Sequence, residues 1–374
     1  MKVYLDNNAT APIRPEVIDV VKDAMAQVGN ASSIHGYGRG ARKDVEKARE
    51  SVARLAGCNP DQVIFTSGAT ESNNTILNNH KESTTLVSAI EHPAGRAPAN
   101  DSIEIPVTPD GIVDLERLNE LLKRHAPVAL VSVMMVNNET GVIQPMEEII
   151  KLAHDAGAKV HSDAVQAAGR LPIRFNDFGF DSMALSAHKF GGPQGVGALI
   201  LKKGVTIEPY LKGGGQERRM RAGTENVAGI AGFGKAAELA LEHTDDFQNL
   251  DKLLAKMEDG IKSLSPQAII YGEDAPRVSN TCCLGLPGVP AETILMNLDL
   301  GGIAVSTGSA CSSGVVKPSP VIKAMGASEQ DAANTVRLSM GWHTTQEDID
   351  HFLKIWSKIV DRLHDKITTQ QATQ

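Results

Sequence analysis

The chain has 374 residues, of which 41% are hydrophobic and 22% charged, and its formal net charge is -8. This composition is that of a globular protein of about two domains, and the net negative charge argues against a protein that coats nucleic acid. No apolar run approaches the roughly 18 residues that a membrane helix needs. The N-terminus lacks the apolar core of a signal peptide, and the four cysteines show no disulfide framework. We therefore expect a reducing, cytoplasmic location. No histidine or cysteine cluster has zinc spacing, so we expect no metal site.

Short apolar runs alternate with helical stretches through the first two thirds of the chain. The predicted elements, in order, are strands at 63–66 and 85–88, helix 114–125, strand 129–133, helix 147–156, and strands at 159–162, 182–186 and 198–201. This alternation predicts an α/β fold, with a mostly parallel sheet sandwiched by helices. Ligands of such sheets bind at the carboxyl ends of the strands.

The pattern changes near residue 248 to that of a smaller α+β domain. The predicted elements are helices at 251–263, 291–298 and 346–364, and strands near 269–271 and 281–284. We expect an arm at 1–13 that packs with the small domain, a large domain at 14–248, the small domain at 249–366 and a disordered tail at 367–374.

Lys189 lies just before a glycine-rich turn, with Ser186 and His188 beside it. A neutral lysine amine forms a Schiff base with an aldehyde, and a partly desolvated pocket favours the neutral amine. The neighbouring hydroxyl, imidazole and glycine amides are suited to binding an anion. A lysine imine beside a phosphate-binding loop is what pyridoxal phosphate requires. The alternative is an exposed lysine in a tight turn before a strand.

Two further segments offer groups that this cofactor would need. Asp163 comes directly after the predicted strand 159–162, where it could keep a pyridinium nitrogen protonated, and Gln166 could donate to a ring oxygen. Ala69 and Thr70 open a helix after a strand, where free amides and the helix dipole form a phosphate site. The alternatives are that Asp163 is a helix N-cap and that residues 66–72 form an ordinary turn between a strand and a helix.

His92, Asn138 and Arg337 are candidates for contact with the cofactor ring or the substrate. His92 follows a strand and could lie on a ring and move protons at neutral pH. Asn138 ends another strand, and Arg337 in a short strand could hold a substrate carboxylate in two-point fashion. The alternatives are a structural histidine, a simple turn and a surface salt bridge.

Cys311 lies in a segment of small residues, and this composition predicts a mobile loop. A thiol on such a loop could attack a substrate atom. An inert cysteine is the alternative. Cys58, Cys282 and Cys283 are expected to behave as small buried hydrophobes. The run of glycines and arginines at 212–224, which ends at Thr224, suits an anion site or a subunit contact.

These residues, in this order and over almost the whole chain, closely resemble the cysteine desulfurases of the NifS/IscS group. That group belongs to the class V aminotransferase-like, fold-type I pyridoxal phosphate enzymes. The match begins at residues 4–10, passes through 29–35 and ends at 337–339. Lys189 within Ser-x-His-Lys and Cys311 within Ser-x-Ser-Ala-Cys are its most specific marks.

The resemblance implies a cytoplasmic homodimer that removes sulfur from L-cysteine, leaves L-alanine and carries the sulfur as a persulfide. An iron-sulfur scaffold or another sulfur acceptor would be its partner, with no membrane and no direct nucleic acid. Lys189 would hold the cofactor and Cys311 would take the sulfur. The other implied roles are ring contact for His92, Asp163, Gln166 and Asn138, phosphate contact for Ala69, Thr70, Ser186, His188 and the second subunit's counterpart of Thr224, and carboxylate binding for Arg337 with Asn138.

The sequence departs from the group at a few positions. Met135 replaces a common histidine, residues 317–320 replace a common Glu-Pro-Ser-His, and Trp342 and His343 replace Arg-Phe. These departures leave the catalytic set intact and leave the acceptor unidentified. Two alternatives remain open: a related enzyme acting on another amino acid, such as an aminotransferase or selenocysteine lyase, and an inactive binding protein with the same fold.

Overall fold

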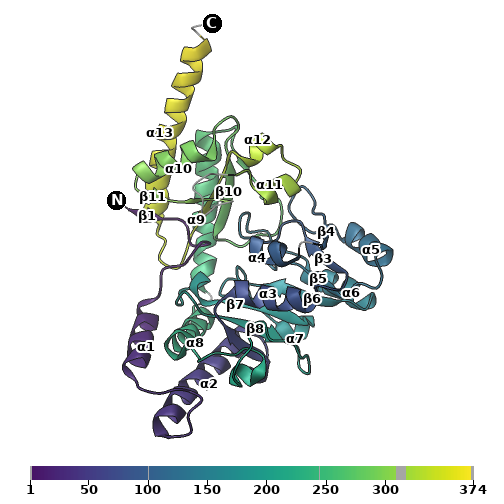
Figure 1. Cartoon of the computed structure of the whole chain (residues 1–374). Coiled ribbons are helices and arrows are strands. Elements are labelled where there is room, and N and C mark those ends of the chain that lie inside the picture. The colour runs from purple at the N-terminus through teal and green to yellow at the C-terminus, as the bar shows by residue number, and fades with distance from the viewer. Residues whose placement is uncertain (1, 100, 244, 309–316, 372–374) are drawn as a thin grey trace.

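The computed structural model describes residues 2–99, 101–243, 245–308 and 317–371 (Figure 1). Its largest sheet contains β2 (Val63–Thr66), β3 (Thr85–Ser88), β4 (Ile103–Ile105), β5 (Leu130–Ser132), β6 (Lys159–Asp163), β7 (Ser182–Ser186) and β8 (Gly197–Leu201). Within the described residues the strand order is β2-β8-β7-β6-β5-β3-β4. Only β8 runs antiparallel to its neighbours in this sheet. The predicted α/β fold with a mostly parallel sheet is confirmed.

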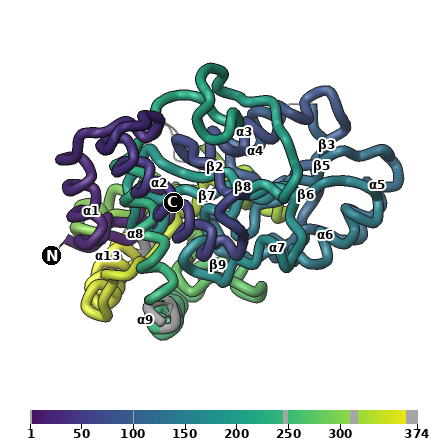
Figure 2. Tube along the Cα trace, turned by 90° about the horizontal axis from the view of Figure 1, so that it is seen from below, coloured from purple at the N-terminus to yellow at the C-terminus, as the bar shows by residue number. Residues whose placement is uncertain are grey.

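Helices cover both faces of this sheet (Figures 1 and 2). Along β8, Ala198 and Ile200 face a core that includes α2 and α8, whereas Leu199 and Leu201 pack with Ile76 of α3. This division follows from the alternation of side chains across a strand. The helices and turns of this part are α1 (Pro15–Ala26), α2 (Gly36–Ala56), α3 (Ala69–Asn79), α4 (Pro93–Arg96), α5 (Leu115–Arg124), α6 (Met146–Asp155), α7 (Phe175–Phe178), α8 (Val227–Glu242), η1 (Pro60–Gln62), η2 (Ala97–Ala99), η3 (Ala187–Lys189) and η4 (Gln216–Arg219).

The last third of the chain builds a separate antiparallel sheet with its own core. Its strand order is β12 (Ser306–Thr307), β13 (Thr335–Ser339), β10 (Thr281–Gly285) and β9 (Ile269–Ile270). The helices here are α9 (Asp245–Leu264), α10 (Ala291–Leu300), α11 (Pro320–Ala324), α12 (Glu329–Ala332) and α13 (Gln346–Gln371). Trp356 of α13 is fully buried and donates from Nε1 to Ser265 Oγ at 3.0 Å.

The N-terminal segment crosses to this second core. Strand β1 (Val3–Tyr4) pairs in parallel with β11 (Ile303–Ala304), and Val3 and Leu5 are buried in the same cluster as Trp356. The chain then turns toward the large sheet, and Asn7 N donates to Ser339 O at 3.1 Å. The segment after β1 therefore lies between the two sheets. The domain boundaries given above stay predictions.

Three helices are longer than predicted, and α10 exceeds its predicted end by only two residues. Helix α9 begins at Asp245, before the expected start at residue 251, and α13 continues to Gln371 (Figure 1). Helix α13 thus reaches into the segment 367–374, where no glycine or proline occurs, and the disorder expected for that tail stays a prediction. No helix in the described ranges has the length and apolar character needed to cross a bilayer.

Candidate active site

Lys189 is held at the carboxyl end of β7 by the single turn η3. Its Nζ donates to the carbonyl oxygen of Asn8 at 2.7 Å. Burial lowers the pKa of Lys189 to about 8, and the nearby charges of Arg337 and Arg170 act in the same direction. Asp163 and Asp6 oppose this shift. At pH 7 about a tenth of such an amine is neutral, against well under a thousandth of an ordinary lysine, so Lys189 is suited to nucleophilic attack on an aldehyde.

Asp163 ends β6, and a chain of hydrogen bonds orients its carboxylate. Oδ2 accepts from Asn73 Nδ2 at 2.7 Å, and Oδ1 accepts from the backbone N–H of Val165 at 3.1 Å. The Asn73 amide then presents Oδ1 to His161 Nε2 at 2.9 Å, and His161 Nδ1 lies 2.9 Å from Ser182 Oγ. Because Asn73 Oδ1 only accepts, His161 carries its proton on Nε2.

The start of α3 lies beside the end of β7. Gly68, the N-cap of α3, has φ of 154°, a conformation that favours glycine. A β-carbon at Gly68 would lie 3.8 Å from Ser186 Oγ, and one at Gly197 would lie 2.6 Å from Gly68 Cα. Ala69 and Thr70 form the first turn of the helix, and Thr70 is exposed. Helix amides and a serine hydroxyl therefore face the same space, which suits an anion.

His188 and Thr224 are the remaining residues predicted to contact a phosphate. Burial lowers the pKa of His188 to about 4, with Lys189 adding to the shift, so its ring is neutral. Its Nδ1 lies 3.2 Å from Thr10 Oγ1. Thr224 is exposed and lines a pocket together with Ser67 of the same chain. A contact of Thr224 with a second subunit stays a prediction.

His92 caps the short helix α4, and its Nδ1 accepts from the backbone N–H of Ala94 at 3.1 Å. Desolvation by the surrounding protein lowers the pKa of His92 even though the side chain reaches solvent. Asp163 opposes this shift, whereas Lys189 and Arg337 add to it. The charges of these residues act on one another, so the structure brings together groups from four separate parts of the sequence.

Arg337 lies in β13 and is buried, which excludes a surface salt bridge. Its Nη2 bonds Asp6 Oδ1 at 2.8 Å, and its Nη1 donates to the carbonyl oxygen of Asn138 at 3.1 Å. Its Nε is buried without a partner among the described residues. Asn8 Nδ2 also donates to Asn138 O, at 3.1 Å. The guanidinium therefore retains a donor for a further acceptor such as a carboxylate.

Sequence reasoning missed the part that Asn8 takes in this site. Its carbonyl oxygen accepts from both Lys189 Nζ and Gln166 Nε2, the latter at 3.0 Å. The only signal in the sequence is the polar run Asp6-Asn7-Asn8 after a short strand. It also missed Asn73, whose side chain joins Asp163 to His161.

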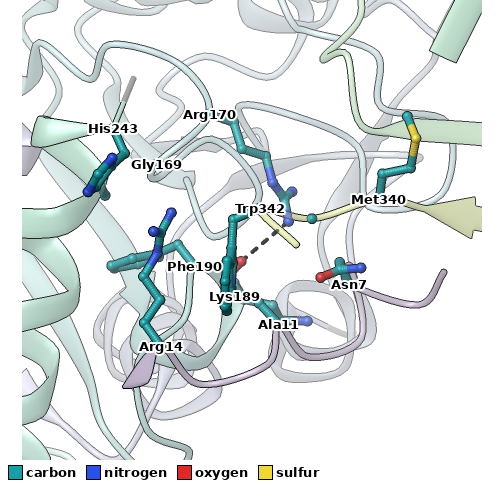
Figure 3. Close-up of a pocket in the computed structure, with 12 residues that line it drawn as sticks. Asn7, Ala11, Arg14, Gly169, Arg170, Lys189, Phe190, His243, Met340 and Trp342 are labelled. Atoms are coloured by element: carbon teal, nitrogen blue, oxygen red, sulfur yellow. Dashed lines mark hydrogen bonds between the residues drawn. The ribbon is translucent and has the colours of Figure 1, made fainter. Parts of the chain in front are cut away.

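Lys189 also lines a pocket (Figure 3). Its lining includes Asn7, Arg14, Arg170 and Trp342, and excludes Asp163, His92 and Arg337. The Arg14 guanidinium carbon lies 5.0 Å from the centre of the Trp342 ring, a cation–π distance. Lys189 therefore belongs both to this pocket and to the candidate active site.

Cys311 falls at residues 309–316, outside the described residues. Burial raises the pKa of the other three thiols, to about 12 for Cys58. Cys282 and Cys283 are fully buried in β10, as expected, whereas Cys58 is half-buried. These three thiols are poor nucleophiles at neutral pH.

The donor set fits pyridoxal phosphate. The cofactor has three groups that a protein must bind: an aldehyde, a pyridine nitrogen and a phosphate. The site offers an amine of lowered pKa for the aldehyde, a carboxylate at a strand end for the nitrogen, and a helix N-terminus beside a serine for the phosphate. The residues that supply them lie at the carboxyl ends of β6 and β7 and at the start of α3.

Comparisons with known proteins agree with this geometry. A family model described as "Aminotransferase class-V" matches residues 3–352. A "Cysteine desulfurase IscS" of Dictyoglomus turgidum is 39% identical, with 97% of this chain and 95% of that protein covered. A solved NifS-like protein from Rickettsia africae superposes with a TM-score of 0.91 at 36% identity, covering 96% of this chain and 100% of that one. A solved structure of SspA in complex with cysteine gives 0.80 at 27% identity, covering 92% and 100%. The chain therefore belongs to the class-V aminotransferase family and, within it, to the cysteine desulfurases, which depend on pyridoxal phosphate.

Proposed function

We propose that this protein removes sulfur from L-cysteine, releases L-alanine and takes the sulfur as a persulfide on Cys311. The observation that carries the proposal is Lys189, with its lowered pKa, within electrostatic reach of Asp163, His92 and Arg337. Further support comes from relatives that bear the name cysteine desulfurase over nearly their whole length.

The cofactor would be held by residues at the ends of the strands. Asp163 would face the pyridine nitrogen, and Gln166 the phenolic oxygen. Ala69, Thr70, Ser186 and His188 would hold the phosphate, with Thr224 from a second subunit, and His92 would lie on the ring. When bound, pyridoxal phosphate withdraws electrons from the substrate Cα and so stabilises negative charge there.

The substrate would be oriented and deprotonated by groups of this chain. Arg337, through the Nε that has no partner among the described residues, and Asn138 would hold the carboxylate of cysteine. Lys189 is the base expected to take the Cα proton, and His92 is suited to move protons beside it.

Sulfur transfer to Cys311 is balanced without an external oxidant. The Cys311 thiolate attacks the substrate sulfur, so that a sulfur–sulfur bond forms as the carbon–sulfur bond breaks. The electron pair of the broken bond stays on carbon, which takes up a proton and becomes the methyl group of alanine. L-cysteine and an enzyme thiol thus give L-alanine and an enzyme persulfide. An aminotransferase would need no thiol.

A homodimer is also part of the proposal. Met25, Val28, Ile34 and Tyr37 are each more than 70% exposed around the end of α1 and the start of α2. Apolar side chains gathered in this way are typical of a contact surface, which a second copy would cover. The proposed location is the cytoplasm, and the proposed partner is an iron-sulfur scaffold or another sulfur acceptor. Light scattering of the purified protein tests the dimer, and a monomer at all concentrations would refute it.

The function is tested by incubating the cofactor-loaded protein with cysteine and a thiol reductant, which releases the persulfide sulfur as sulfide, and by measuring alanine and sulfide. Lys189→Ala should lose cofactor retention and turnover, whereas the matched control Lys203→Ala should keep both. Cys311→Ala should lose turnover, and Cys58→Ala should not. A wild-type protein that takes up no pyridoxal phosphate would refute the whole proposal, and undiminished turnover in Cys311→Ala would refute the persulfide step.

A further inference from the structure

Arg170 lies beside the candidate active site, in the segment that follows β6 (Figure 3). Its Nη1 donates to the carbonyl oxygen of Gln166 at 3.0 Å and also to Gln166 Oε1. Its Nη2 donates to the carbonyl oxygen of Lys189 at 3.5 Å, the dashed contact in Figure 3. Among residues 2–99, 101–243, 245–308 and 317–371, no carboxylate forms an ion pair with Arg170. The guanidinium is thus committed to two residues of the cofactor site.

The contact with Gln166 decides which end of that amide faces the site. A guanidinium has five donors and no acceptor, so only the amide oxygen can lie against it. Gln166 Nε2 must then point the other way, and it does so, donating to Asn8 O at 3.0 Å. Without Arg170 only Asn8 O would still favour this orientation, so the amide would be held less firmly and its oxygen could turn toward the site more often. A ring oxygen that carries negative charge needs the nitrogen there as a donor.

The contact with Lys189 places a positive charge near the reactive amine. Arg170 is one of the two charges that lower the pKa of Lys189, after burial and Arg337. Loss of that charge therefore favours the protonated amine. The two effects are separable because the amide orientation needs the shape of the guanidinium, whereas the electrostatic effect needs only its charge.

We propose that Arg170 is a positioning residue, which fixes the Gln166 amide with its nitrogen toward the cofactor. This proposal rests on pyridoxal phosphate binding, which is part of the proposed function. It concerns how firmly and how fast the cofactor is held, so its test does not depend on desulfurase turnover.

Two variants of Arg170 separate shape from charge. Arg170→Met removes both, and Arg170→Lys keeps the charge alone. The matched control is Arg174→Met, since Arg174 is exposed, pairs with Glu147 at 3.9 Å and stacks on Phe178 outside the site. Cofactor release from the holoenzyme is followed by visible absorbance after dilution. Cofactor uptake by the stripped protein is followed as a function of pH, where the wild-type midpoint should lie near the Lys189 pKa of about 8.

Both Arg170 variants should release the cofactor faster than wild type, and Arg174→Met should match wild type. The uptake midpoint should move to higher pH in Arg170→Met, with uptake at pH 7 slowed about threefold for each half unit. In Arg170→Lys the midpoint should not move. In a Gln166→Ala background, neither Arg170 substitution should speed release further, because the residue through which Arg170 acts is gone.

Additive effects of Gln166→Ala and Arg170→Met on release would overturn the proposal, as would wild-type release in both Arg170 variants. If circular dichroism shows that Arg170→Met does not fold, Arg170→Lys alone and combined with Gln166→Ala carries the same test. Failure of the wild-type chain to bind pyridoxal phosphate would refute the proposed function itself. Normal wild-type binding with unchanged Arg170 variants would refute this inference only.

Discussion

His161 should make the folded protein lose stability as the pH falls below neutral. Its ring is buried between Asn73 and Ser182, and burial lowers its pKa from 6.5 to about 3, with His80 adding to the shift. Because the pKa is lower in the folded than in the unfolded chain, the unfolded chain binds a proton first as the pH falls. The stabilisation from a neutral His161 is therefore complete above pH 6.5 and is lost progressively toward pH 3. Between pH 7 and pH 5 the linkage amounts to about 2 kcal/mol.

The prediction is checked by urea denaturation at pH 7 and pH 5, followed by circular dichroism at fixed protein and cofactor concentrations. His161→Asn removes the titrating group, so its loss of stability over this interval should be smaller than that of wild type by about 2 kcal/mol. His125→Asn, at the end of α5, controls for the loss of any histidine and should follow wild type. Equal losses in wild type and His161→Asn would refute the reasoning, whatever the absolute stability of the variant.

Three further predictions concern contacts at or near the site. Arg49 and Glu217 form a buried ion pair with N–O distances of 2.8 and 2.9 Å, so Glu217→Gln should lower the free energy of unfolding by about 3–5 kcal/mol. The double variant Arg49→Met with Glu217→Leu should lose less stability than the sum of the two single variants. Additive losses in denaturation experiments would contradict this. Arg337→Lys should raise the KM for cysteine by one to two orders of magnitude, about 1.5–3 kcal/mol, because a lysine cannot keep the contacts with Asp6 and Asn138 and also supply the donor that Nε offers. An unchanged KM in steady-state kinetics would exclude carboxylate binding there. Gly68→Ala should weaken the affinity for the cofactor, because the φ of 154° at this position strains any residue with a side chain. Fluorescence titration measures that affinity, and a wild-type value would show that the turn before α3 does not hold the phosphate.

Local pattern predicted the elements that carry the site well. The strand that ends at Ser186 has the expected bounds, and the one that ends at Asp163 is one residue longer than expected. Strands in a parallel sheet are buried on both faces, so their apolar runs are distinct from the surrounding helices. Turn residues at the ends of those runs then indicate where side chains can meet a ligand.

Contacts between distant parts of the chain were not predictable in this way. Asn8 and Lys189 are 181 positions apart, and Asn73 and Asp163 are 90 apart. Their pairing depends on how the N-terminal segment passes between the two sheets and on the face of α3 that packs on β6 and β7. The role of Arg170 was not predicted because a single arginine in the segment after a strand forms no distinguishing sequence pattern.

The carbonyl oxygens of Asn8 and Asn138 have a consequence for how this site tolerates change. Asn8 O receives Lys189 and Gln166, and Asn138 O receives Arg337 and Asn8. Every residue type possesses this oxygen, so alanine scanning leaves both acceptors in place and reports only on the side chains. The path of the backbone therefore supplies the acceptors for the lysine and the arginine, and the side chain of Asn8 is the one part of this arrangement that an alanine substitution at either position would remove.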